Sequence, residues 1–293
     1  SLMFMELLNE EFEGRLDMAI QIFKNQYPKN FLHQLVSSQL DMDRLDYLKR
    51  DSFFTGVTEG VISSDRIIKM LNVVDDALVV DQKGIYSIEK FLISRRLMYW
   101  QVYLHKTVLS ADQLLVGLLK RATWLASRNA ELFATPALSY FLKSNPESFS
   151  IANRNVFLQH FSELDDADII SAAKVWTDHP DTVLSFLCKG FIHRKLFTVE
   201  LEDEPFSPAR TDDLRHRVAR YMNISEEEAE YLVLSESISN YIYTDMDDRI
   251  KIFRKNGDIL DISEASDMLN ISVLSHTIRK YFLCYPKFIK EIF

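Results

Sequence analysis

The chain has 293 residues, 47% of them hydrophobic, so it can bury a core as one large domain or two ordinary ones. Its net charge of −9 removes the overall basic field that draws proteins to a phosphate backbone, so a nucleic-acid partner is not expected. The two cysteines cannot form a disulfide framework and no apolar run has the length of a membrane helix, which together predict a cytoplasmic protein without membrane attachment.

The first two thirds of the chain are predicted to be mainly α-helical, because only seven glycines and seven prolines interrupt long stretches of helical period. Between residues 77 and 86 we expect a short β excursion with its turn at 81–84. The acidic run at 162–168 is interpreted as a helix N-terminus and not as a metal loop. The predicted helices cover residues 2–13, 15–26, 31–56, 63–71, 87–108, 110–129, 131–143, 150–161, 165–177 and 180–190.

Beyond residue 195 the pattern changes to short α and β segments. Residues 249–253 and 259–262 flank the sequence Lys-Asn-Gly-Asp, which is a strong hairpin turn. The fold class predicted for the whole chain is therefore mainly α with a C-terminal α+β appendage. The other elements expected in the appendage are strands at 196–201 and 280–284 and helices near 209–221, 225–232 and 263–270.

Residues 38–52 are unusually dense in charge for one helix. Asp43, Tyr47, Arg50 and Asp51 recur at i, i+4, i+7 and i+8, so they share one face, while Leu45 points elsewhere. One interpretation is a solvated surface helix, in which Asp46 pairs with Arg50, four positions further along the helix. The other is a wall of a polar pocket, which suits a face that combines a ring with charges of both signs.

A second polar stripe lies on the segment 94–106. Arg95, Tyr99, Tyr103 and Lys106 follow helical spacing, and His105 lies beside them. The stripe can be the rim of an amphipathic helix whose cations extend to solvent, or it can hold phosphates between two cations while its rings pack on a sugar or base. The usual nucleotide-loop, nucleophile-elbow and zincin motifs do not occur in the chain.

Taken together, Leu-Asp-Met-Asp-Arg-Leu-Asp-Tyr-Leu-Lys-Arg-Asp at 40–51, the following Phe-Phe-Thr-Gly, Arg95, and Tyr-Leu-His-Lys at 103–106 resemble the HD-domain phosphohydrolase superfamily. The resemblance is greatest to its deoxynucleoside triphosphate triphosphohydrolases with SAM and HD domains, and it covers residues 1 to about 125 and, more loosely, the region around Arg194. It implies the C-terminal part of an HD-like helical bundle at 1–130, a helical extension at 131–195 and an α+β domain at 196–293.

The family holds a divalent metal (Mn, Mg, Fe or Zn) with one His, an adjacent His-Asp pair and a later Asp. Only the later Asp has a match, which is Asp43, and no His-Asp dipeptide occurs in the chain. In the family the missing ligands precede the position of Ser1, so we expect these residues to be the C-terminal part of an enzyme and to be inactive alone.

For the intact protein the resemblance implies metal-dependent hydrolysis of a nucleotide, most concretely of a dNTP to deoxynucleoside and triphosphate. Asp43 would be the catalytic metal ligand. The substrate-binding positions implied are Arg44, Arg95 and Lys106 for phosphates, Tyr47 and Asp51 beside the sugar, Tyr103 against the deoxyribose and His105 on the substrate side.

The implied partners are a nucleotide substrate, a nucleotide activator and further copies of the chain in a dimer or tetramer, with Lys83 and Arg194 as phosphate contacts between subunits. The main alternative is a non-catalytic, nucleotide-binding and oligomerising HD-like protein. A hydrolase for a different phosphate ester and a helical interaction protein with two solvated faces are further alternatives. An upstream His and His-Asp pair in the full gene would favour the enzyme.

Overall fold

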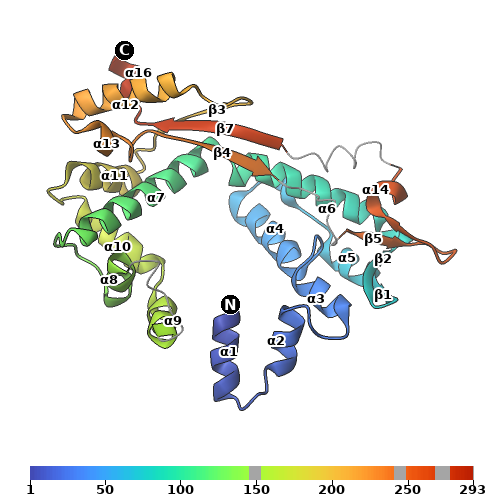
Figure 1. Ribbon diagram of the computed structural model, residues 1–293. Helices are drawn as coiled ribbons and strands as arrows, with labels where there is room; N and C mark the ends of the chain where they lie inside the picture. Colours follow the sequence, from blue (N-terminus) through green and yellow to red (C-terminus); the bar gives the residue numbers. More distant parts are fainter. Residues whose placement is uncertain (145–152, 241–248, 268–277, 293) are drawn as a thin grey trace. The chain divides into compact units, whose positions relative to one another are not determined.

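The computed structural model describes residues 1–144, 153–240, 249–267 and 278–292 and divides the chain into two compact units (Figure 1). The first unit comprises Ser1–His105 and Ser239–Ile278, and the second comprises Lys106–Ile238 and Arg279–Phe293. This division differs from the three consecutive segments expected from the sequence. The physical reason is a late hairpin that pairs with a strand near residue 80, because pairing between distant segments leaves no local pattern.

The first unit is mainly helical. The predicted helix at 31–56 is wrong, because Ser37 has an extended backbone and Asp41 starts a new helix by accepting the N–H of Arg44. Gly14, at φ 83°, lies in the break between the first two helices. In chain order the helices are α1 (Leu2–Glu11), α2 (Asp17–Phe23), α3 (Asn30–Val36), α4 (Met42–Thr55), the short η1 (Thr58–Gly60), α5 (Ser64–Met70), η2 (Gln82–Gly84), α6 (Ile85–Met98), the π-helical η3 (Tyr99–Tyr103) and α14 (Ile262–Ala265).

A four-stranded sheet in the order β1-β2-β5-β6 completes the first unit; its strands are β1 (Leu71–Val74), β2 (Ala77–Asp81), β5 (Lys251–Phe253) and β6 (Ile259–Asp261). The β segment expected at 77–80 is confirmed as β2, and the chain turns after it in η2, but the β structure expected at 85–86 is wrong, because α6 starts at Ile85. The hairpin instead precedes β2 and turns at Asp75 and Asp76, both at positive φ, as a type I′ turn requires. The hairpin predicted around Gly257 is confirmed, since β5 and β6 pair antiparallel. Strand β5 also pairs parallel with β2, with Val80 opposite Ile252.

The core of the first unit joins its helices to this sheet. Leu48 of α4, Ile88 and Phe91 of α6 and Ile252 of β5 are completely buried in one cluster. Helices α4 and α6 therefore pack side by side, as Figure 1 shows, and the polar faces of both helices border the same apolar contact.

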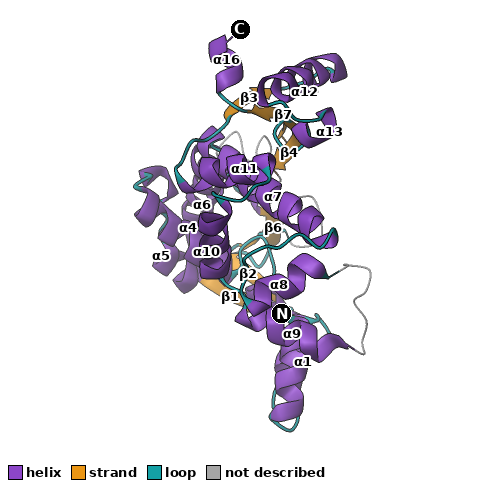
Figure 2. Cartoon of the chain, turned by 90° about the vertical axis from the view of Figure 1, so that its left-hand side faces the viewer, coloured by secondary structure: helices purple, strands orange, loops and turns teal. Residues whose placement is uncertain are grey.

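The second unit contains α7 (Lys106–Ser127), α8 (Pro136–Lys143), α9 (Arg154–Glu163), α10 (Asp166–Trp176), α11 (Thr182–Ile192), α12 (Pro208–Met222), α13 (Glu226–Ala229) and α16 (Phe288–Ile292). Its sheet has the order β3-β7-β4, from β3 (Thr198–Glu202), β7 (Ile278–Tyr285) and β4 (Leu234–Asn240). Helix α7 packs on α11, and α8 contacts both α9 and α10 (Figure 2).

Most of the elements predicted for the second unit are present, and the chain is mainly α with an α+β C-terminal part, as expected. The acidic run before α10 is a helix N-terminus, because Asp165 and Asp168 form a capping box. Strand β4 was not predicted. The predicted positions 150–152 and 268–270 lie outside the described residues. No helix in the described ranges combines the length and the apolar character needed to cross a bilayer.

Candidate functional site

Helix α4 forms the first wall of the candidate site. Charged residues at the start of this helix fix its N-terminus. The Asp41 carboxylate, 6% exposed, accepts the backbone N–H of Arg44 at 2.8 Å and also pairs with the Arg44 guanidinium. Asp46 pairs with Arg50 on the exposed side, as the spacing predicted. These two acids therefore have structural partners within the helix, while Asp43 is exposed in its first turn.

The second wall begins in α6 and continues into η3. The predicted continuous helix over 87–108 is wrong, because α6 ends at Met98 and residues 99–103 form a π-helix. The backbone N–H of Leu104 bonds the carbonyl of Tyr99, five residues back, at 2.7 Å. Helix α7 then starts at Lys106. The predicted stripe is thus not one α-helical face.

The two walls meet through a group of tyrosines and one carboxylate. The Tyr103 hydroxyl donates to Oδ2 of Asp51 at 2.7 Å, and the Tyr103 ring packs edge-on against that of Tyr47 with centroids 6.2 Å apart. The Tyr99 ring lies 5.3 Å from that of Tyr103, again edge-on. We name Tyr47, Asp51, Arg95, Tyr99 and Tyr103 the tyrosine cluster.

Arg95 is the buried cation of the tyrosine cluster, with 4% of its surface exposed. Its Nη1 donates to Gln39 at 3.0 Å, and its guanidinium carbon lies 6.0 Å from the Tyr99 ring centroid. Its Nε is buried and has no hydrogen-bond partner within the described part of the chain. A buried N–H of this kind is costly unless something accepts from it, so Arg95 carries one donor that the described residues leave unsatisfied.

Burial and neighbouring charges shift the pKa values of two tyrosines of the cluster. Burial, followed by the hydrogen bond to the Asp51 carboxylate, raises the pKa of the Tyr103 hydroxyl above its ordinary value. Burial also raises the pKa of Tyr47, although the nearby Arg95 opposes that shift. Both hydroxyls therefore keep their protons at neutral pH, and Tyr103 acts as a donor to Asp51.

The structure brings together four of the predicted site residues: Tyr47, Asp51, Arg95 and Tyr103. Arg44 is close enough to Tyr47 for its charge to act on that hydroxyl. His105 is exposed after the π-helix, and Lys106 is the exposed first residue of α7 in the second unit. The exposed Lys83 and Arg194 belong to different units. Gln39, a contact of Arg95, was missed, since a single Gln outside the motif gives no signal.

The residues present do not make a complete metal site. Within the described ranges, no three His, Cys, Asp or Glu side chains are grouped so that they could hold a metal ion. Asp43 alone offers one carboxylate, whereas a transition-metal site needs several ligands in a fixed geometry. The described residues therefore supply at most one ligand of the metal that the family resemblance implies.

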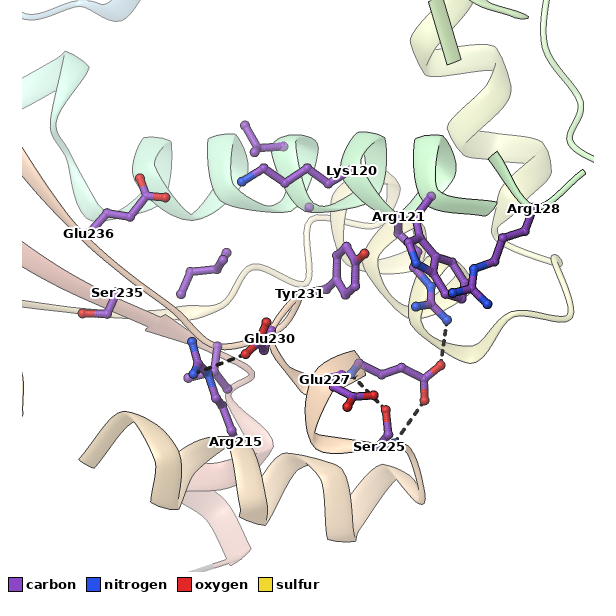
Figure 3. Close-up of a pocket in the computed structure, with 16 residues that line it drawn as sticks. Lys120, Arg121, Arg128, Arg215, Ser225, Glu227, Glu230, Tyr231, Ser235 and Glu236 are labelled. Atoms are coloured by element: carbon purple, nitrogen blue, oxygen red, sulfur yellow. Dashed lines mark hydrogen bonds and ion pairs between the residues drawn. The ribbon is translucent and has the colours of Figure 1, made fainter. Parts of the chain in front are cut away.

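A cavity of about 750 Å³ lies within the second unit, between α7 and residues 225–236 (Figure 3). Arg121, 2% exposed, donates to Asp181 at 2.6 and 3.1 Å and to Glu228 at 2.7 Å, and it lies over the Trp124 ring. Four cations and four carboxylates line the cavity, so its charge does not favour one sign of ligand. The hydrogen bonds of Arg121 tie α7 to the starts of α11 and α13.

Comparisons with known proteins agree with the motif. A family model described as the HD associated region matches residues 62–133. The crystal structure of a phosphohydrolase from Bacteroides thetaiotaomicron is 55% identical, with a TM-score of 0.91 over 97% of this chain and 70% of that chain.

Two further relatives extend the comparison. An uncharacterized protein of Bacillus subtilis is 29% identical over 96% of this chain, which spans 64% of that protein's length. A Dictyostelium discoideum protein, named as a deoxynucleoside triphosphate triphosphohydrolase homologue, is 30% identical over 79 residues, which are 26% of this chain and 15% of that protein. From the matched family region and the similarity to the Bacteroides phosphohydrolase, the chain belongs to the HD phosphohydrolase superfamily.

Proposed function

We propose that the intact protein hydrolyses a nucleotide, most concretely a dNTP to deoxynucleoside and triphosphate. The observation that carries the proposal is the tyrosine cluster, in which a carboxylate, three rings and a buried cation with a spare donor meet on two adjacent walls. The name of the Dictyostelium relative supports the choice of a dNTP. The name of the Bacteroides relative supports phosphohydrolysis in general.

Each part of the cluster suits one part of such a substrate. Arg95, through its Nε, and the neighbouring Arg44 would hold phosphate oxygens, and Lys106 would add a third cation. Asp51 accepts from Tyr103 through Oδ2, and we propose that Oδ1 accepts from the 3′-hydroxyl of the sugar. The Tyr103 ring, fixed by that hydrogen bond, would then lie against the sugar and disfavour a 2′-hydroxyl.

The metal, the activator and the homo-oligomer stay predictions. Asp43 would supply one metal ligand, and the remaining ligands would come from outside the residues described. His105 would lie on the substrate side, and Lys83 and Arg194 would contact an activating nucleotide between subunits.

The test uses the full-length protein with Mn²⁺ or Mg²⁺, each of the four dNTPs and a mixed pool of possible activating nucleotides. We expect triphosphate release from at least one dNTP, loss of release in Asp43→Ala, and unchanged release in the matched control Asp46→Ala, whose carboxylate pairs with Arg50 on the exposed side of α4. Full turnover by Asp43→Ala would contradict the assignment. Nucleotide binding that Arg95→Met removes, without turnover by the parent, would establish the non-catalytic alternative. The 293 residues alone are expected to release no triphosphate.

A further inference from the structure

The π-helix η3 changes where Tyr103 lies relative to Arg95. In an α-helix with 3.6 residues per turn, a residue four positions on lies about 40° past its predecessor, so residues 95 and 103 would diverge by about 80° around the axis. The i→i+5 hydrogen bonding of η3 makes its turn wider than an α-helical turn, so Tyr103 lies nearly above Tyr99 along the helix axis. The angle between residues 95 and 103 around the axis therefore does not double. Arg95, Tyr99 and Tyr103 can therefore all reach Tyr47 on α4.

Both the backbone and the ring of Tyr99 take part in this wide turn. Its carbonyl accepts the Leu104 N–H at 2.7 Å, which is the bond that closes the π turn. Its half-buried ring stands between the Arg95 guanidinium, 6.0 Å from the ring centroid, and the Tyr103 ring, 5.3 Å away. The ring therefore lies between a cation and a tyrosine whose hydroxyl donates to Asp51.

We propose that Tyr99, through the contacts of its ring with Arg95 and Tyr103 at the π turn, is a positioning residue that holds Tyr103 against Asp51 and so sets the discrimination between deoxyribose and ribose substrates. This inference rests on the proposed function for its substrate. π-helical turns are rare and are found often at functional sites, and here the Tyr99 ring lies between Arg95 and Tyr103.

The kinetic test compares the ratio of kcat/KM for dATP to that for ATP, or for the best dNTP and its ribose counterpart, in the full-length protein. Tyr99→Ala is expected to lower this ratio roughly 10-fold, since a displacement of about 1 Å in a positioning group can cost still more. Tyr99→Phe keeps the ring and is expected to retain the ratio within about twofold. In the Tyr103→Ala background, Tyr99→Ala should change the ratio no further, because the group that it positions is gone.

A second measurement tests the geometry without turnover. Deletion of the exposed Gln101 removes the extra residue of the π turn, whereas Gln101→Ala keeps the chain length and serves as the matched control. With ring-¹³C-labelled tyrosine, and the Tyr103 signal assigned from Tyr103→Phe, we expect that signal to move on deletion and to stay in place in the control.

The outcomes separate the two proposals. If the parent protein hydrolyses no nucleotide, the proposed function fails, and the labelled-tyrosine measurement still decides whether η3 places Tyr103. An unchanged sugar ratio in Tyr99→Ala, an equal loss in the Tyr103→Ala background, or an unmoved Tyr103 signal after the deletion would each overturn the positioning role. If the deletion variant does not fold, the labelled Tyr103 signal in Tyr99→Ala and the kinetic series decide the matter, and a signal that stays in place in Tyr99→Ala would overturn the positioning role.

Discussion

Replacing Arg121 by Met should destabilise the second unit more than the same replacement of an exposed cation near Arg121. Arg121, labelled in Figure 3, is almost fully buried and donates to both Asp181 and Glu228, so the variant leaves two carboxylates around an apolar side chain. Asp181 also caps α11, and Glu228 belongs to the capping box of α13. The loss therefore reaches two helix starts as well as α7.

Removing one partner from a buried ion pair typically costs about 3–5 kcal/mol, because the remaining charge is left uncompensated. We expect the lower half of that range, since the Glu228 side chain is 33% exposed and can be solvated after the change. Arg128→Met is the matched control. Arg128 stacks on the same Trp124 ring, 4.1 Å from its centroid, but it is exposed, so its loss should cost less than about 1 kcal/mol.

The pH dependence of this destabilisation has a defined sign. Burial alone would raise the pKa of Asp181, but hydrogen bonds from Arg121 and Leu184 outweigh it and lower the pKa. The pKa of Glu228 is lowered by the Ser225 N–H and, against some burial, by Arg121. Carboxylates with a lowered folded pKa contribute stability above their unfolded pKa, which is about 4, and the contribution is lost as the pH falls through the folded value.

The free energy of unfolding can be measured in urea, with hydrogen exchange of the second unit as the readout, at pH values from about 7 down to about 3.5. The difference in unfolding free energy between the parent and Arg121→Met should be largest near neutrality and should shrink below about pH 4. A difference under 1 kcal/mol at neutral pH, or one that does not change with pH, would refute the reasoning.

Two further predictions concern packing. Gly60→Ala should lower the free energy of unfolding by about 1–3 kcal/mol, because a Cβ there would lie 2.6 Å from Sδ of Met98 and 2.8 Å from Cβ of Ser52. A variant that unfolds at the same urea concentration as the parent would contradict this. Burial raises the pKa of both the Cys188 and Cys284 thiols to about 12. Iodoacetamide at about pH 8 should therefore modify neither cysteine until the protein is unfolded. Rapid alkylation of the folded protein would count against the buried placement of the two thiols.

The sequence predicts best what local spacing and turn chemistry determine. The helices at 131–190 have amphipathic repeats, and the turn ending at Gly257 needs a positive φ, so both are confirmed. The break after Ser37 and the β1–β2 turn were missed, because an N-cap Asp inside a charged run and an Asp-Asp pair at positive φ are weaker signals than Gly or Pro.

The candidate site was predictable as far as one motif covers it. The spacing brought Tyr47 and Asp51 onto one face of α4, but the π-helix that turns Tyr103 toward Asp51 has no signature in the sequence. The Arg121 network was not predicted at all. Its partners lie 60 and 107 residues away along the chain, a separation at which a single sequence gives no indication of contact.

The parallel pairing of β2 with β5 has a consequence for how the protein is made. The partner of Val79 is Lys251, so a ribosome adding about 5–20 residues per second needs roughly 10–30 s after β2 emerges to deliver the strand that completes its sheet. During that interval the nascent β2 has an uncovered edge that can pair with another chain. The sheet of the first unit can therefore be completed only after residue 253 has been made, and a message truncated before residue 251 yields a product in which this edge of β2 lacks its partner strand.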